Sequence, residues 1–260
     1  MPQYYTVPPT GVGLPDYSAP KPTGQVSQGP VFTLTDLAEV AARLKSIDTH
    51  DRRGNVIWLD DFEDGITKWF TSTGGVGASA AASADYARNG ILSARLVTGD
   101  LIDDFADMTH FSPFPVRSRV GFEASYSHVN VNFSIIHQMV FYDGQFEHIA
   151  AIRFDDTTGM FQYRDSTGAW VEFCADPILW SVPRFMTLKL VIDLNSFKYV
   201  RAIIGNVEYD LSNIDYRHPA SAALAQWQQN ITLYTAVNAN RIIHVDDVIL
   251  TQNEPVNISV

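Results

Sequence analysis

The stretch 186-MTLKLVIDLNSFKYVRAIIGNVEYDL-211 decides the fold of this chain. Apolar side chains occupy every second position of its first part, namely Met186, Leu188, Leu190 and Ile192. A period of two places these side chains on one face of a β-strand, so that face is expected to be buried. Gly205 and Asn206 then mark a tight turn, because glycine accepts the positive φ that such hairpins need. The stretch therefore predicts consecutive antiparallel strands.

The same pattern continues through the chain from Val56 onward. Five side chains share one face of another long strand, namely Phe133, Ile135, His137, Met139 and Phe141. This strand runs into Asp143-Gly144, a strong hairpin signal, and residues 146–154 are expected to form the return strand. We expect about a dozen strands, with residues 220–227 able to form a helical turn on a connection. Such a series closes most economically as two packed antiparallel sheets.

The N-terminal 32 residues follow neither period. The first thirty residues hold seven of the thirteen prolines and only two charged side chains, Asp16 and Lys21. Proline cannot donate a backbone hydrogen bond, so we expect residues 1–32 to form an extended arm, at about 3.1 Å per residue where it is polyproline-like. An arm of this length is expected to hold a neighbouring chain, and the alternative is that it folds back along its own domain.

Residues 33–50 carry the only convincing helical period in the sequence. Leu37, Val40 and Leu44 recur at helical spacing, which predicts one amphipathic helix that needs one partner surface. The arm and this helix supply the residues that we expect to make assembly contacts: Tyr4, Tyr5, Pro8, Pro9, Tyr17, Leu37, Val40 and Leu44.

Composition excludes several classes of partner. A formal net charge of −11 without a basic cluster argues against nucleic acid. No stretch approaches the ~18 apolar residues of a membrane span, and the N-terminus lacks the basic-then-apolar pattern of a signal peptide. The single cysteine, Cys174, excludes an internal disulfide. We expect no nucleic acid, no membrane and no signal peptide.

Three segments carry a resemblance to known families: 58-WLDDFEDGITKWF-70, 88-RNGILSARLVTG-99 and 244-HVDDVILT-251. Together they resemble the frame of jelly-roll carbohydrate-binding modules, and residues 180–212 are similar to the paired strands of laminin-G-like domains. The resemblance implies an all-β, antiparallel jelly-roll sandwich of the concanavalin-A-like kind over residues 56–260. An extended arm before such a domain resembles the organisation of phage virion structural proteins, including capsid decoration proteins.

The resemblance also implies a structural calcium ion. In such modules the acids of the first and last strands often share one, and the matching residues are Asp61, Glu63, Asp246 and Asp247. Calcium takes six to eight oxygen ligands, which adjacent first and last strands can supply. The alternative is that these acids form turns and solvated edge charges. No other cofactor is expected.

Binding of a glycan requires exposed aromatic rings beside polar groups. The candidates are Trp170, Trp180 and Trp227, with Tyr234 beside them, and packing in the core is the alternative for each tryptophan. No strand carries the Glu-x-Asp-x-x-Glu pattern of glycosidases on this fold, and no HExxH or GxSxG motif is present. His137 is interpreted as a core histidine. We therefore expect no catalytic residues and no enzyme.

Two functions fit these observations. The first is a virion structural protein, a capsid decoration or stabilising protein, located in the virion and assembled in the host cytoplasm. Its arm would tie neighbouring subunits together, so its partners would be copies of itself, for instance in a trimer, and a capsid or other particle protein. The alternative is a carbohydrate-binding module or a glycan-attachment lectin, which accounts for the sandwich but gives the arm no task.

Overall fold

β-Strands make up all of the regular secondary structure in the part of the chain that the structure describes. The computed structural model describes residues 53–175 and 181–256, and these contain fifteen strands and no helix. The predicted arm at 1–32, the predicted helix at 33–50 and the eight expected assembly contacts lie outside the described residues, and so does Trp180. Those expectations stay predictions. Within the described part, no helix has the length and apolar character that crossing a membrane requires.

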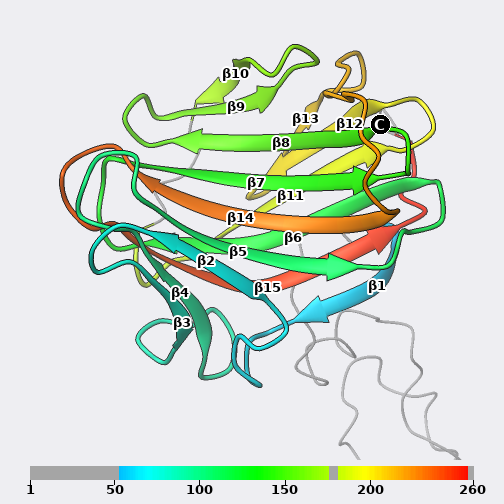
Figure 1. Cartoon of the computed structure of the whole chain (residues 1–260). Coiled ribbons are helices and arrows are strands. Elements are labelled where there is room, and N and C mark those ends of the chain that lie inside the picture. The colour runs from blue at the N-terminus through cyan, green and yellow to red at the C-terminus, as the bar shows by residue number, and fades with distance from the viewer. Residues whose placement is uncertain (1–52, 176–180, 257–260) are drawn as a thin grey trace, which may run out of the picture. The chain divides into compact units, whose positions relative to one another are not determined.

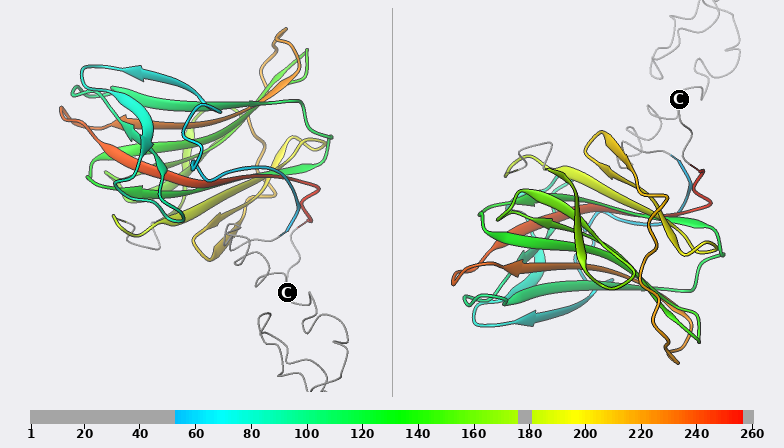
Figure 2. Two further views of the ribbon diagram at one scale, coloured as in Figure 1. Left: turned by 90° about the horizontal axis from the view of Figure 1, so that it is seen from below. Right: turned by 90° about the horizontal axis from the view of Figure 1, so that it is seen from above.

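The strands form two antiparallel sheets that lie face to face, seen as two layers in Figure 2. Sheet A has the order β13-β12-β11-β6-β15-β4-β3, with β1 paired to β15. Its strands are β1 (Asn55–Asp60), β3 (Ser79–Ser83), β4 (Ser93–Val97), β6 (Arg119–His128), β11 (Met186–Asp193), β12 (Lys198–Ile204), β13 (Val207–Asp210) and β15 (Ile242–Gln252).

Sheet B has the order β10-β9-β8-β7-β14-β5-β2 and lies nearer the viewer in Figure 1. Its strands are β2 (Phe70–Gly74), β5 (Phe105–Ser112), β7 (Phe133–Tyr142), β8 (Glu147–Asp155), β9 (Met160–Arg164), β10 (Trp170–Ala175) and β14 (Gln226–Thr235). The predicted jelly-roll sandwich is confirmed, including the pairing of the first strand of the domain with the last.

The alternating apolar side chains form a continuous core between the sheets. On β7 the five side chains from Phe133 to Phe141 that were expected to share one face are all buried, and on β11 Leu190 and Ile192 are inaccessible to solvent. The expected helical turn at residues 220–227 is wrong. Ala220 makes a β-bridge to Phe146, and β14 already begins at Gln226, because pairing with the sheet satisfies more backbone groups than one isolated turn does.

Both predicted hairpins are present. Gly144 and Gly205 lie in the turns β7–β8 and β12–β13 with φ of 90° and 61°, a conformation that side chains with a Cβ rarely adopt. The Asp143 carboxylate fixes the first turn by accepting hydrogen bonds from the backbone N–H groups of Gln145 (2.9 Å) and Phe146 (2.7 Å). Turn chemistry therefore sets the register of both strand pairs.

Two polar side chains tie the sheets together across the core. His137 of sheet B is fully buried, and its Nε2 donates to the Phe122 carbonyl (3.0 Å) while its Nδ1 accepts from the Tyr126 hydroxyl (2.6 Å), both on β6. Tyr199 of sheet A reaches the other way, and its hydroxyl donates to the Arg164 carbonyl (2.7 Å) and accepts from the Ala151 N–H (3.0 Å). His137 is thus a satisfied core histidine, as expected from the sequence.

Burial of His137 predicts a pH dependence of stability. Desolvation lowers the pKa of His137 to about 3, whereas an unfolded histidine has a pKa of about 6.5. The unfolded chain therefore binds more protons between these values, so stability is complete above about pH 6.5 and falls as the pH drops. From pH 6.5 to 4.5 this site should cost about 2 kcal/mol. Urea unfolding should show that loss in the parent chain and a correspondingly smaller loss in His137→Gln, whereas equal losses would contradict the assignment.

Candidate functional site

The outer face of sheet B carries several polar and aromatic side chains. On β14 the side chains of Trp227, Ile231 and Leu233 point into the core, so the alternate positions point outward. Cross-strand partners lie on the same face, which allows the outward set to be followed from strand to strand. The polar side chains on this face of the central strands are Gln138 on β7, Gln228, Asn230 and Thr232 on β14, and Asp107 and Thr109 on β5. The apolar Ile136, Val140, Ile149 and Ala151 share the face on β7 and β8.

Three side-chain amides in the middle of this face have no hydrogen-bond partner among the described residues. Gln138 is the direct cross-strand partner of Asn230, and Gln228 lies two positions before Asn230 on β14. No side-chain hydrogen bond joins Gln138, Gln228 or Asn230 to any other residue within 53–175 and 181–256, and the buried Asn230 Oδ1 has no partner there. Buried amide oxygens in proteins are normally hydrogen-bonded. These groups are therefore available to a ligand.

Next to the amides, Asp107 is held by two hydroxyls. Thr232 Oγ1 donates to one carboxylate oxygen at 2.6 Å, and Thr109 Oγ1 donates to the other at 3.0 Å. Burial raises the pKa of Asp107, while the two hydroxyl hydrogen bonds act in the opposite direction. The carboxylate is fixed in position and its acceptor capacity is largely used by the protein.

Aromatic side chains border the polar centre. At the β2–β5 edge Phe70 is 64% exposed and Phe111 is 51% exposed. Phe105 and Tyr234 form a tilted pair with ring centroids 6.0 Å apart. At the opposite edge Trp170 of β10 lies under Arg153, whose guanidinium carbon is 4.7 Å from the ring centroid. Apolar rings at both edges with amides between them suit a ligand that has apolar faces and polar rims.

The predicted glycan-contacting tryptophans have different locations. Trp227 is fully buried and stacks on Phe141 with ring centroids 5.0 Å apart, so the prediction that it contacts a glycan is wrong. It occupies an inward position of β14, where core packing takes the whole ring. Trp170 is on the outer face of sheet B, and Trp180 is not among the described residues.

Sequence reasoning missed the amides, although a signal for them was present. In 226-QWQQNITLY-234 the inward Trp227, Ile231 and Leu233 define the strand face, and Gln226, Gln228 and Asn230 then fall at alternate, outward positions. The same alternation that predicts the buried face of this strand also predicts that these amides lie on its outer face. The site prediction was based on the tryptophans instead.

The four acids that were predicted to hold calcium lie near one loop, residues 88–92. Asp246 accepts the backbone N–H of Arg88 (2.7 Å), and Asp247 accepts from the Arg88 guanidinium (2.8 Å) and the Asn89 amide (2.6 Å). Successive strand residues normally face opposite ways, but the β15–β6 register shifts after Asp246 and Asp247 has a φ of 51°. This bulge lets both carboxylates reach the loop.

Glu63 contacts the same loop from the other end of the domain sequence. Its Oε1 accepts the backbone N–H groups of Ile91 (2.6 Å) and Leu92 (2.8 Å), whereas Asp61 accepts the Glu63 N–H (3.2 Å). Asp61 and Glu63 therefore act through backbone donors in the described structure.

Whether these residues fit a calcium ion depends on free oxygens. Asp247 Oδ1 is buried without a hydrogen-bond partner in the described part, which suits a cation. However, no three His, Cys, Asp or Glu side chains within residues 53–175 and 181–256 gather closely enough to hold a metal ion. Arg88 supplies a positive charge there, and burial together with the charge of Asp247 raises the pKa of Asp246 to about 7. The fit is partial, and calcium stays a prediction.

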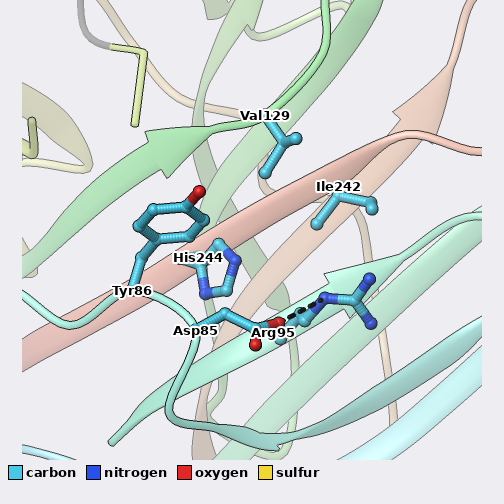
Figure 3. A pocket seen from close by; sticks show the side chains of 6 residues that line it. All are labelled: Asp85, Tyr86, Arg95, Val129, Ile242 and His244. Atoms are coloured by element: carbon cyan, nitrogen blue, oxygen red, sulfur yellow. Dashed lines mark ion pairs between the residues drawn. The ribbon is translucent and has the colours of Figure 1, made fainter. Parts of the chain in front are cut away.

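A depression of about 290 Å³ lies on the outer side of sheet A, lined by Asp85, Tyr86, Arg95, Val129, Ile242 and His244 (Figure 3). Its polar groups are engaged with one another. Arg95 pairs with Asp85 (3.6 Å), and His244 Nδ1 contacts Ser93 Oγ (3.1 Å) while its ring meets Tyr86 edge-on. Burial lowers the pKa of His244 to about 4, so it is neutral at pH 7. The outer face of sheet B is the better candidate site.

Comparison with known proteins gives the fold. No protein-family model and no curated protein sequence matches the chain. Among solved structures it is similar to the cellulose-induced protein Cip1, at 14% identity over 77% of this chain and 100% of that one with a TM-score of 0.51. An endo-β-1,4-glucuronan lyase from the fungus Trichoderma reesei matches at 8% identity over 76% of this chain and 96% of the lyase, with a TM-score of 0.56.

A sialidase also matches, at 10% identity over 77% of this chain with a TM-score of 0.50, and the chain spans 19% of the sialidase. Identities this low establish a shared sandwich fold and no shared activity. Fold likeness alone thus leaves both a binding role and a catalytic role open.

The Arg88 contacts yield a stability prediction. Arg88→Ala should destabilise the domain by about 3 kcal/mol, because it leaves the buried Asp247 carboxylate without its ion-pair partner, while the backbone N–H that binds Asp246 remains. Arg95→Ala removes a partly exposed pair with Asp85 and should change stability by less than about 1 kcal/mol. Chemical denaturation of the three chains measures both effects. Equal stability of Arg88→Ala and Arg95→Ala would contradict the role of Arg88.

The same variants test calcium. If the acids hold calcium, a chelator lowers the melting temperature of the parent chain, and added calcium chloride restores part of the stability that Arg88→Ala loses. If neither addition changes the melting temperature, the calcium prediction is contradicted, and these carboxylates are compensated by Arg88 and the N–H groups of residues 88–92.

Proposed function

We propose that this chain is a carbohydrate-binding protein whose ligand lies on the outer face of sheet B. The observation that carries the proposal is the set of neighbouring amides Gln138, Gln228 and Asn230, which have no hydrogen-bond partners among the described residues. An amide offers both donors and an acceptor, which matches the hydroxyl group of a sugar on both counts.

The borders of the face support a sugar ligand. A pyranose ring has an apolar face of C–H groups, which packs on aromatic side chains, and a rim of hydroxyls, which needs polar partners. Phe70 and Phe111 expose aromatic surface at one edge, whereas the Trp170 ring at the other edge is covered by the Arg153 guanidinium. The amides and the exposed rings of Phe70 and Phe111 therefore match the ligand in both respects.

The extent of the face indicates an oligosaccharide. From Asp107 on β5 to Glu172 on β10 the face crosses β14, β7, β8 and β9, and strands in a sheet are about 4.8 Å apart. The face is therefore about 24 Å wide from β5 to β10, and Ile136 and Ala151 separate its amides from the polar side chains of β8–β10. A single sugar would occupy only part of it.

The similar structures are consistent with this proposal in a limited sense. The glucuronan lyase and the sialidase are, by their names, proteins that act on carbohydrates, and they share only the fold with this chain. The proposal includes no catalytic step, because it rests on groups that bind hydroxyls.

The predicted function as a virion structural protein depends on the arm and helix at residues 1–50, which the structure does not describe. That function stays a prediction and has its own test. A chain that lacks residues 1–30 should lose self-association relative to the full chain in light scattering, because the arm was expected to tie subunits together. Identical masses of the two folded chains would contradict that expectation without affecting the proposed glycan site.

The amides give the decisive variants for the glycan proposal. Gln138→Ala and Asn230→Ala should each weaken oligosaccharide binding by about five- to tenfold, since each loses hydrogen bonds worth about 1 kcal/mol. Asn195→Ala is the matched control, because Asn195 is an exposed amide in the β11–β12 turn of sheet A. Calorimetric titration of the full chain with cellohexaose, xylohexaose, mannohexaose and β-1,4-oligoglucuronate measures these affinities.

Two results would contradict the proposal. One is the absence of binding to every oligosaccharide by a folded parent chain. The other is binding that Asn195→Ala weakens as much as the two sheet B variants do, because the ligand would then lie elsewhere.

A further inference from the structure

Three arginines on the outer face of sheet B lack a carboxylate partner. Six of the described arginines pair with acids: Arg53, Arg88, Arg95, Arg117, Arg119 and Arg201. The other five make no ion pair with any residue in 53–175 or 181–256, and they are Arg153, Arg164, Arg184, Arg217 and Arg241. Three of these five, Arg153, Arg164 and Arg217, gather on one face, although acids outnumber bases in the chain by 29 to 18.

Sheet geometry directs all three side chains to the face that carries the amides. Arg153 on β8 lies opposite Ile136, which in turn lies opposite the outward Thr232. Arg164 follows Gln162, the cross-strand partner of Arg153, by two positions on β9. Arg217 lies opposite Ile149 in a β-bridge and so shares the side of that outward residue. Cross-strand partners share a face, so the three guanidinium groups gather at one corner of sheet B.

Local contacts bring the three side chains together. Arg153 and Arg164 lie over the Trp170 ring, with guanidinium carbons 4.7 Å and 5.9 Å from its centroid. Gly168 joins the remaining pair, because a Cβ atom built on it would lie 3.6 Å from Arg217 Cδ and 3.8 Å from Arg164 Nη2. Trp170 and Gly168 thus form the floor between the arginines.

The guanidinium of Arg153 is oriented by an amide and forms no ion pair in the described part of the chain. Its Nε donates to Gln162 Oε1 at 2.7 Å, and the Gln162 amide nitrogen lies 3.5 Å from Glu172 Oε1. The charge of Asp155, two positions along β8, raises the pKa of Arg153 and so offsets part of the effect of burial. The two terminal nitrogens of Arg153 have no partner in the described part of the chain, and partial burial lowers its pKa. An anionic ligand would offset the cost of that burial.

We infer that this corner, formed by Arg153, Arg164, Arg217 and Trp170, is a subsite for an anionic group carried by the bound sugar, a carboxylate or a sulfate. The inference rests on the proposed glycan-binding function. Guanidinium groups bind carboxylate and sulfate oxygens through paired hydrogen bonds, and Trp170 holds two of the guanidinium planes in place through cation–π contact. The adjoining amides bind the hydroxyls, so the ligand class is an acidic oligosaccharide.

Matched ligands separate this inference from the function on which it rests. β-1,4-Oligoglucuronate and cello-oligosaccharide of equal length share linkage and ring, and they differ in the carboxylate at C6. The full chain should bind the acidic oligomer about tenfold more tightly, in a manner weakened by salt. Sulfated cello-oligosaccharide tests sulfate as the anion, and a single-stranded DNA oligonucleotide tests general attraction to polyanions.

Substitutions of the arginines test whether the preference for the acidic oligosaccharide arises at this corner. Arg153→Gln and Arg217→Gln should each remove most of the preference for the acidic oligomer and leave cello-oligosaccharide binding unchanged. Arg95→Gln is the matched control, since Arg95 lies on the outer face of sheet A. Melting temperatures show whether each chain is folded, and Arg153→Lys tests for charge without the guanidinium fork.

Each outcome of these titrations supports or contradicts the acidic subsite. Equal affinity for neutral and acidic oligomers, or a preference that survives Arg153→Gln and Arg217→Gln in folded chains, overturns the acidic subsite while the glycan function stands. DNA binding as tight as that of the oligoglucuronate overturns it in favour of a general polyanion surface. The absence of binding to every oligosaccharide overturns the function itself.

Discussion

Close packing of inward side chains from β7 and β14 is the constraint on which the rest of this structure depends. Trp227 stacks on Phe141, and the next inward residues complete a core from which solvent is excluded. Because strand residues alternate, each side chain that is committed to the core fixes its neighbours on the opposite face. The side chains of the candidate site therefore lie on the opposite face of the strands that form the core. A register shift of one residue would turn the site side chains inward and the core side chains outward.

Charge is distributed unevenly over this frame. The chain is strongly acidic, and six of the eleven described arginines are paired with its own carboxylates, which leaves them little capacity for a ligand. At the β8–β10 corner the amide of Gln162, and no carboxylate, accepts the hydrogen bond of the Arg153 guanidinium. A neutral partner orients the arginine and leaves its charge for an external anion.

Sequence predicted the fold well and the site poorly, for a common physical reason. Alternation and turn residues act over a few neighbouring positions, so the strand at 186–193 and the turns at Gly144 and Gly205 could be predicted. The site depends on which strands become neighbours. Arg217 meets Arg153 and Arg164 only because its segment bridges β8 at Ile149, and no local pattern encodes that pairing. The bulge that turns Asp247 toward Arg88 was equally invisible, since it arises from a register shift in β15.

Tyr199 gives this arrangement a further consequence. Its hydroxyl comes from sheet A and bonds the backbone of β8 and β9 at Ala151 and Arg164, where the pairing of these two strands ends. Beyond that point β8 is free to pair with the segment that contains Arg217. The Tyr199 hydroxyl thus occupies the backbone groups at which β8 and β9 separate, and the segment with Arg217 pairs with β8 beyond that point. Sequence change in that segment could then alter ligand preference without disturbing the core, and surface specificity could diverge among chains that keep the same interior.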